Sequence, residues 1–296
     1  MRVVTNIDNV TLQITCDDKE EQKEKLEGLI AFVKERGLFK VIRPQYEKKE
    51  RDIKIRNKRN TIAKIRTSAF YAGRDIKGKK IVKYYISIKF AGLSKYVKRL
   101  DMLSNNLLFA IAAYMNSHES IEYTLTAIDI CIDLECKFDK MAVICTKHAS
   151  RSEYYELTEK QAYITTNNIE RISIPKLKRA ALRSYFYYKT QKDKLDYPLT
   201  RFELKLNSKF LKTHGVKMDA IENALNRYHV MYFKDIAVKN SIVEEYSRST
   251  LDRQKKIDTL NLEKYRVYAD ITYVEHFLIT LFNLDESLLH VDKYDI

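Results

Sequence analysis

Three short segments carry the residue types that phosphodiester chemistry needs. The first is AIDICID, in which Asp129 and Asp133 lie four residues apart. On a strand, side chains at this spacing share one face, and the isoleucines between them point to the other face. Carboxylates on an otherwise apolar strand are costly to bury unless basic side chains or a divalent cation offset them. If the strand instead has a solvent-exposed face, these acids need no partner.

The second segment, FYYKTQ, contains Tyr187, Tyr188 and Lys189. A tyrosine phenolate can attack a phosphodiester and form a covalent phosphotyrosine, which preserves the bond energy for rejoining. The ordinary pKa of a phenol is about 10, so a nucleophilic tyrosine needs a nearby cation or base. Adjacent strand residues face opposite ways, so Tyr187 and Tyr188 are competing candidates, and Tyr187 is the one we favour.

The third segment, TRFELKL, places Arg201, Glu203 and Lys205 on one strand face. Such an alternation of charge is usually an exposed ladder of side chains. If this strand lies beside the acidic strand, Glu203 can instead join Asp129 around one Mg²⁺ or Mn²⁺ ion, because these ions prefer carboxylate oxygens. The ion, Lys189 or Arg201 could then supply the positive charge that the phenolate requires.

Strands and helices must position these segments. The opening NIDNVTLQITC alternates apolar and polar residues, which predicts a strand with Val10, Leu12 and Ile14 buried. Asp17 or Asp18 can cap the helix that follows, and Gly37 ends it. The other expected elements are a hairpin (67–74 and 81–90), a helix (95–116), a long strand (121–136), a helix from Asp139 to Thr146, short strands in RSEYYELT and QAYITT, and helices beyond Ser208.

These elements predict an α+β fold. We expect a largely antiparallel sheet with flanking helices and a possible internal repeat, followed by a helical C-terminal region. The expected division is a catalytic and DNA-binding domain over residues 1–215 and a helical region over residues 216–296. The charge changes at the same place, since residues 1–215 hold 43 Lys/Arg and 26 Asp/Glu, whereas residues 216–296 hold 11 and 14.

The net charge of +14 indicates a polyanionic partner, because basic surfaces bind phosphates with release of counterions. Its densest basic stretch, residues 47–66, has nine basic and three acidic side chains around alternating isoleucines, which favours a basic strand or an extended arm over a helix. A phosphate-tracking surface and a solvated sheet edge are both consistent with it. The candidate DNA-binding residues are Lys54, Arg56, Lys58, Arg59, Lys64 and Arg66, with residues 77–83 as a second basic segment.

Several function classes are disfavoured by missing motifs. The sequence contains no GxxxxGK or GxGxxG loop for a nucleotide, no H-x-H pair and no CxxC pair. The four cysteines are expected to be reduced thiols of a cytoplasmic protein. The longest apolar run, residues 107–115, is too short to span a bilayer, so no membrane association is expected.

The three segments, in this order, resemble the Rep_trans (replication initiation factor) family of rolling-circle plasmid replication initiators and related conjugative-element relaxases. That family has strands of the form R-x-D-x-x-x-D, Y-x-K and R-x-E-x-x-x-K. AIDICID matches the first with Asp129 and Asp133, FYYKTQ the second, and TRFELKL the third. The likeness covers about residues 5–240. Ala127 stands in place of the first arginine, and Asn207 stands where a lysine is common.

The resemblance implies a protein that binds an origin of replication and nicks one strand through a covalent 5′-phosphotyrosine. It implies Asp129, Asp133 and Glu203 as ligands of Mg²⁺ or Mn²⁺, and Tyr187 as the nucleophile beside Lys189 and Arg201. The implied partners are double-stranded origin DNA with a single-stranded or hairpin nick site, a second copy in a homodimer, and a helicase. A conjugative relaxase would use the same chemistry.

Two other functions belong to different classes. Ala127 favours an initiator-like DNA-binding protein that does not nick. A tyrosine recombinase is disfavoured, because the sequence has no Arg…His-x-x-Arg…Tyr series. Metal-dependent nicking of DNA separates the enzyme from the binding protein.

Overall fold

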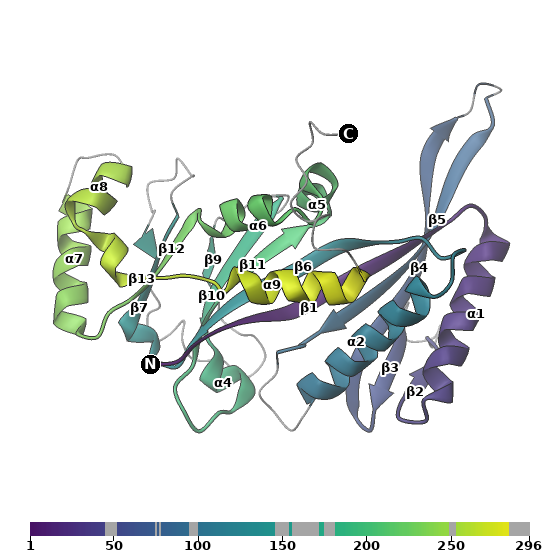
Figure 1. Cartoon of the computed structure of the whole chain (residues 1–296), viewed down its shortest axis with the longest axis horizontal. Coiled ribbons are helices and arrows are strands. Elements are labelled where there is room, and N and C mark those ends of the chain that lie inside the picture. Colours follow the sequence, from purple (N-terminus) through teal and green to yellow (C-terminus); the bar gives the residue numbers. More distant parts are fainter. Residues whose placement is uncertain are drawn as a thin grey trace. The chain divides into compact units, whose positions relative to one another are not determined.

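The computed structural model describes residues 1–44, 52–74, 76, 78–94, 100–145, 154–155, 172–174, 181–248 and 253–283. It confirms the α+β class, with a large, mainly antiparallel sheet and a C-terminal region rich in helices (Figure 1). Within these ranges, no helix is both long and apolar enough to cross a bilayer. The strand predicted over QAYITT and the first turn of the helix predicted from residue 95 lie outside the described residues.

The chain divides into two compact units. Among the described residues, unit 1 comprises Met1–Asn6 and those within Asp129–His276, and unit 2 comprises those within Ile7–Ile128 together with residues 277–283. The boundary that the sequence suggested, between residues 215 and 216, falls inside unit 1. Two long strands, β1 (Val3–Cys16) and β6 (Tyr123–Leu134), contribute residues to both units.

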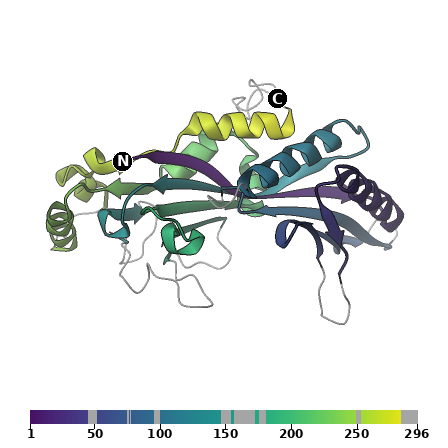
Figure 2. The same cartoon turned by 90° about the horizontal axis from the view of Figure 1, so that it is seen from below.

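Unit 2 is a sheet covered on one face by helices. Its strands follow the order β2 (Lys40–Ile42), β3 (Ile53–Asn57), β4 (Asn60–Arg74), β5 (Lys80–Ala91), β1 and β6. The pairings from β2 through to β1 are antiparallel. Helices α1 (Lys19–Glu35) and α2 (Leu100–Asn116) lie on the same face of this sheet (Figure 2).

Local sequence explains these elements. Val10, Leu12 and Ile14 of β1 are buried, as their alternation predicts. Asp18 is the residue that caps α1, and its side chain accepts a hydrogen bond from the Glu21 backbone N–H at 2.8 Å. The basic segment forms strand β3 rather than a helix, which confirms that prediction.

Unit 1 contains the strands that carry the three candidate segments. Its first sheet has the order β6, β11 (Thr200–Asn207), β10 (Leu182–Tyr188) and β9 (Ile172–Ile174). Its second sheet has the order β13 (Arg266–Val267), β12 (Tyr228–Tyr232), β7 (Met141–Cys145) and β8 (Tyr154–Tyr155). The helical elements are α4 (Lys189–Asp193), α5 (Ser208–His214), α6 (Met218–Leu225), α7 (Ile236–Arg248), α8 (Arg253–Thr259) and 3₁₀ turns η2 (Phe138–Lys140) and η3 (Leu262–Tyr265). Helix α9 (Ile271–Phe282) begins in unit 1, and its residues from Phe277 belong to unit 2.

Two secondary-structure predictions were wrong. The helix expected from Asp139 is a single 3₁₀ turn followed by strand β7. Among the helices expected beyond Ser208, the one over MDAIENALNRYHVMYF (218–233) ends at Leu225 and gives way to strand β12. The two strands pair with each other in antiparallel register. The side chains of Met141 to Ile144 on β7 and of Tyr228 to Met231 on β12 are buried, and short buried runs do not reveal by periodicity whether they are helix or strand.

Candidate active site

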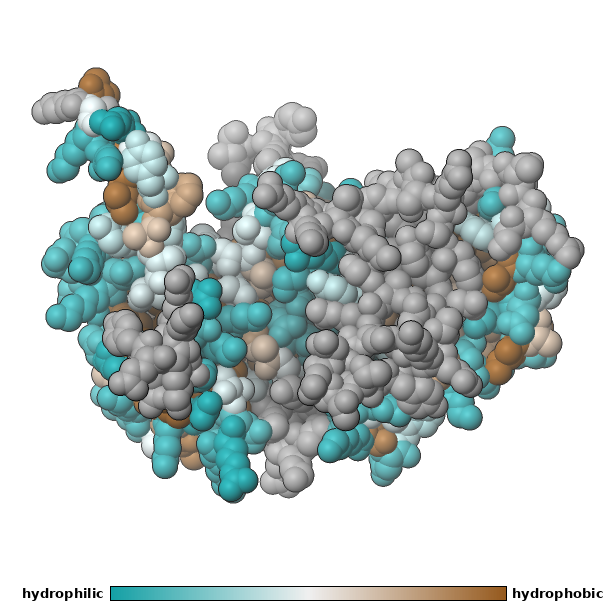
Figure 3. All heavy atoms as spheres, turned by 180° about the vertical axis from the view of Figure 1, so that it is seen from behind, coloured by the Kyte–Doolittle hydropathy of each residue, from teal (hydrophilic) through white to brown (hydrophobic). Residues whose placement is uncertain are grey.

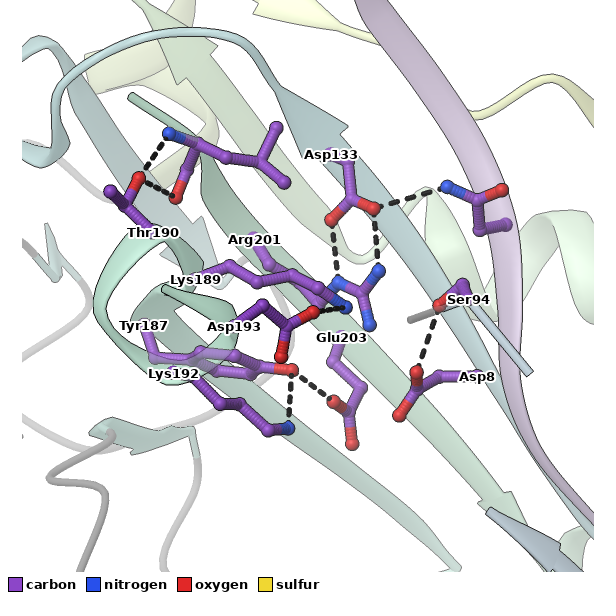
Figure 4. Close-up of polar contacts among 12 residues, drawn as sticks. Asp8, Ser94, Asp133, Tyr187, Lys189, Thr190, Lys192, Asp193, Arg201 and Glu203 are labelled. Carbon is purple, nitrogen blue, oxygen red and sulfur yellow. Dashed lines mark hydrogen bonds and ion pairs between the residues drawn. The ribbon is translucent and has the colours of Figure 1, made fainter. Parts of the chain in front are cut away.

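The candidate site lies on one face of β6, β11 and β10 in unit 1 (Figure 4). Asp133 contacts Arg201, and Asp129, four residues earlier on β6, contacts Lys205, four residues later on β11. These two contacts place Glu203 on the same polar face as the acids of β6. In the antiparallel pairing of β10 with β11, Tyr187 lies opposite Arg201. The structure therefore brings the three segments together.

Tyr187 makes the contact that matters most for chemistry. Its hydroxyl donates a hydrogen bond to Glu203 Oε2 at 2.9 Å, and Lys192 Nζ lies 3.4 Å from the same hydroxyl. The Lys192 ammonium also lies 4.9 Å from the centre of the tyrosine ring. The side chain of Tyr187 is only 1% exposed. A phenol between a carboxylate and an ammonium has both a proton acceptor and a stabilising charge for its phenolate.

Arg201 and Asp133 form a fully buried ion pair on the strands next to Tyr187. Arg201 Nε and Nη2 donate to the two carboxylate oxygens of Asp133, each at 2.5 Å. Asn6 Nδ2 from β1 adds a hydrogen bond to Asp133 Oδ2 at 3.1 Å. Burial by itself lowers the pKa of Arg201, but it is outweighed by electrostatic interactions with Cys131, Asp133 and Tyr187 at the high pH where a guanidinium titrates, and by the hydrogen bonds to Asp133, so this pKa is held well above its ordinary value. The guanidinium is a permanent positive charge beside Tyr187.

Two further ion pairs complete the site. Lys205 Nζ lies 2.6 Å from Asp129 Oδ1, and Lys189 Nζ lies 3.5 Å from Asp193 Oδ2 within the short helix α4. Asp129, Lys189 and Asp193 are all buried. Each of these charges has an opposite charge within reach, which is the condition for burying ionised side chains.

The competing tyrosines take other environments. Tyr188, at the end of β10, packs its ring edge-on against Phe138, with 5.4 Å between ring centroids. Tyr185 lies opposite Glu203 in the strand register and is half-buried. Tyr187, by contrast, directs its hydroxyl to the Glu203 carboxylate. This contact favours Tyr187 as the candidate nucleophile.

The predicted ligands do not assemble a metal site. Among the described residues, no group of three or more His, Cys, Asp or Glu side chains is placed to hold a metal ion. Both oxygens of Asp133 accept from Arg201, and Asp129 accepts from Lys205. Basic side chains of β11 thus offset these carboxylates, which was the alternative to a cation. As they are placed here, the residues do not fit a bound Mg²⁺ or Mn²⁺ ion.

Sequence reasoning missed three members of this site. Lys192 and Asp193 lie in α4, directly after the tyrosine strand, and their i, i+3 and i, i+4 spacing from Lys189 was the available signal. Asn6 reaches Asp133 across 127 residues of sequence. No local pattern could have identified Asn6, because its role depends on strand β1 lying beside β6.

The predicted DNA-binding residues lie apart from this site along the chain, on β3, β4 and the turn that joins them in unit 2. Lys54 lies opposite Lys64 in the strand register, and Lys58 and Arg59 are exposed at the turn. Arg66 Nε lies 2.6 Å from Asp52 Oδ1 in an exposed ion pair. The remaining candidate, Arg56, is half-buried on β3. On the same two strands, the apolar side chains of Ile53, Ile55, Ala63 and Ile65 are buried.

Comparisons with known proteins give likenesses among solved structures alone. No family model matches the sequence, and no curated protein matches it. Among solved structures, the chain is similar to a rolling circle replication initiator protein from Geobacillus stearothermophilus, with 12% identity and a TM-score of 0.40. The alignment covers 96% of this chain and 98% of that chain. A likeness at this identity and TM-score carries no functional inference, so the function is inferred from the site and from the sequence motifs.

Proposed function

We propose that the protein is a replication initiator that nicks and rejoins one strand of DNA, with Tyr187 as the nucleophile. The observation that carries this proposal is the placement of the Tyr187 hydroxyl between Glu203 Oε2 and Lys192 Nζ. The resemblance of the three motifs to rolling-circle initiators supplies the substrate, and the basic charge of the chain agrees with a nucleic acid.

In the proposed reaction, each proton and each bond is accounted for. As the Tyr187 oxygen attacks phosphorus, its proton passes along the existing hydrogen bond to Glu203, and the bond from phosphorus to the 3′ oxygen breaks. The leaving 3′ oxygen takes a proton from solvent, and the 5′ phosphate stays on the tyrosine. Rejoining is the reverse, in which a 3′ hydroxyl attacks the phosphotyrosine and Glu203 returns the proton to the phenolate oxygen.

Basic residues would stabilise the charge that develops during this reaction. Lys192 is placed to stabilise the phenolate, and Arg201, held by Asp133, supports a phosphate near the tyrosine. Because Tyr187 is 1% exposed, a scissile phosphate must displace part of the surrounding structure to reach it. Nicking should therefore include a conformational step before the chemistry.

The enzyme proposal is tested by tyrosine replacement. A supercoiled plasmid carrying the native gene with its flanking DNA is incubated with the protein, and open circles and covalent protein–DNA adducts are measured. We expect Tyr187→Phe to lose both products while DNA binding is retained. The matched control, Tyr188→Phe, should keep both. Adduct formation by Tyr187→Phe would show that the nucleophile is another residue.

The metal requirement and the partners stay predictions. The nicking assay with and without EDTA, followed by added Mg²⁺ or Mn²⁺, tests the requirement for a divalent ion. A homodimer and a helicase partner are expectations from the resemblance alone.

A DNA-binding protein without nicking activity is the second candidate function. The burial of Tyr187 and the pairing of Asp129 and Asp133 with basic side chains favour it. Under this alternative the plasmid is bound but stays supercoiled, in every metal condition.

A further inference from the structure

The hairpin of β4 and β5 extends beyond the rest of unit 2 as a two-stranded ribbon (Figure 1). We define the arm as residues 68–85. Its base is marked by Gln22 of α1, whose side-chain amide donates to Ser68 O at 3.1 Å and to Tyr85 O at 2.8 Å. Arg74 Nη1 donates to Gly78 O at 3.0 Å near the tip, and Gly78 has a φ of 76°, the positive-φ conformation that glycine adopts without strain.

The arm exposes large apolar side chains of a kind that is usually buried in a folded protein. Phe70 is 63% exposed, Tyr71 is 51% exposed, and Ile81 is 40% exposed, while Ile76 at the tip is fully exposed. Figure 3 shows this apolar surface on the projecting ribbon, beside hydrophilic side chains. A cluster of exposed large apolar residues on one element indicates an interaction surface.

The charge of the arm indicates which partner it meets. In the sequence, the arm holds five cations, Arg74, Lys77, Lys79, Lys80 and Lys83, against one carboxylate, Asp75, which gives it a net charge of +4. The strand register puts Lys83 opposite Phe70 and Lys80 opposite Arg74, so cations lie on both faces of the ribbon. Cations interleaved with aromatic side chains suit a polyanion that also offers apolar contacts, which describes the phosphates and bases of a nucleic acid.

We infer that the arm docks in a groove of duplex DNA. The major groove, about 12 Å wide, admits a two-stranded ribbon, whose strands lie about 4.8 Å apart. Seven residues of strand, from Ser68 to Arg74, extend roughly 20–24 Å, enough to enter and follow the groove. The cations would contact phosphates on either wall, and Phe70, on the face of the ribbon that it shares with Lys83, would contact base edges, while Tyr71 lies on the other face. This inference rests on the proposed function for its substrate and adds the surface that holds the duplex.

A second copy of the chain is the competing occupant of this surface. The charges disfavour it, because two arms packed together would bring their lysines and arginines into proximity. The test must therefore report the oligomeric state as well as DNA binding.

Fluorescence anisotropy with a labelled duplex and a labelled single strand from the gene's flanking DNA tests the inference. For Lys79→Gln/Lys80→Gln/Lys83→Gln, the slope of log affinity against log salt should decrease by roughly 0.9 for each phosphate that the arm no longer neutralises. For Phe70→Ser/Tyr71→Ser, duplex affinity should fall about tenfold with an unchanged slope. Both changes should be larger for the duplex than for the single strand.

Matched controls lie elsewhere in unit 2. Lys23→Gln/Lys34→Gln removes two exposed lysines from α1, and Met102→Ser removes a side chain of α2 that is 57% exposed. These variants should bind the duplex with a smaller loss than the arm variants. Unchanged duplex affinity in both arm variants would overturn the inference. So would a change of sedimentation from dimer to monomer that accounts for the lost affinity.

These experiments can disprove the arm inference and the nicking proposal independently of each other. Nicking of the labelled single strand should persist in both arm variants, because the arm contains none of the proposed catalytic residues. If the parent protein nicks neither substrate but binds the duplex through the arm, the proposed nicking fails and the arm inference stands.

Discussion

The two units use charged strand residues in opposite ways. On the candidate site of unit 1, acids and bases alternate across neighbouring strands and are buried, and Arg201 and Asp133 are each 0% exposed. In unit 2, Lys54 lies opposite Lys64, and Lys64 lies opposite Lys89, on a solvent-accessible face. Ionised side chains can be buried only with opposite charges, whereas like charges can stand in a row where water screens them.

Buried, paired charges suit a reaction site, whereas exposed rows of like charge suit a binding surface. A buried, paired cluster holds a tyrosine and its neighbours in fixed positions, as a reaction at phosphorus needs. A row of like charges lowers stability slightly, because like charges opposite each other on a sheet repel. Such a row becomes favourable when a polyanion covers it. This contrast supports the proposals that the reaction takes place in unit 1 and that unit 2 contacts the DNA backbone.

Breaking the buried pair should have the largest effect on stability. Asp133→Ala leaves the Arg201 guanidinium buried without its carboxylate, which costs about 3–5 kcal/mol of unfolding free energy in urea titrations. The exposed pair between Arg66 and Asp52 is the control, and Asp52→Ala should cost about 0–1 kcal/mol. Equal losses in the two variants would contradict the contrast between the units. Asp133→Leu/Arg201→Met should recover most of the stability without recovering nicking.

Replacing Lys192 should slow nicking without changing the fold. Lys192→Gln removes the ammonium 3.4 Å from the Tyr187 hydroxyl, and the loss of one charge that stabilises a developing anion lowers the nicking rate on the order of 10²-fold. Single-turnover nicking measures the rate. Lys194→Gln, at the exposed end of the same helix, should leave it unchanged. A similar loss in both variants would mean that Lys192 does not act on the phenolate.

Burial also disfavours the charged form of a single histidine, His229. Burial, reinforced by Arg266, lowers the pKa of His229 from its ordinary 6.5 to about 4. Between these values the unfolded chain binds a proton that the folded chain does not, so the free energy of unfolding falls as pH falls from 6.5 to about 4. Urea titrations across this range should show a smaller fall for His229→Gln than for the parent. The exposed His276→Gln is the control, and a fall of equal size in His229→Gln would contradict the prediction.

The lysine row should show the smallest effect on stability. Lys54→Gln/Lys64→Gln/Lys89→Gln removes two like-charge contacts and should raise the unfolding free energy by a few tenths of a kcal/mol. The same variant should bind duplex DNA with a reduced dependence on salt. A lower midpoint in thermal unfolding would mean that attractive contacts of these lysines outweigh their mutual repulsion, contrary to this prediction.

The sequence predicted the structure best where apolar and polar residues alternate regularly or where a local capping residue marks the end of a helix. The buried face of β1, the Asp18 cap and the basic strand β3 each follow from a local pattern. Strands β7 and β12 could not be predicted, because each is a short buried run whose pairing partner lies far away in the sequence. Each segment forms a strand because it pairs with the other, and no short stretch of sequence contains both.

The candidate site shows the same limit. The pattern placed Asp129 and Asp133 on one strand face, but whether a cation or a basic residue accompanies them depends on the register of β6 against β11. The choice between Tyr187 and Tyr188 also depends on which face of β10 meets Glu203. Lys192 was overlooked because its place beside Tyr187 depends on the short helix α4, which the sequence analysis did not predict after the tyrosines.

The most direct test of the central claim is to identify the residue that becomes linked to DNA. The protein is incubated with the gene's flanking DNA, the adduct is digested with nuclease and protease, and the modified peptide is sequenced by mass spectrometry. We predict a 5′ phosphate on the hydroxyl of Tyr187, the phenol that contacts both Glu203 and Lys192. A nucleotide found on Tyr188 or Tyr185 instead would contradict the account.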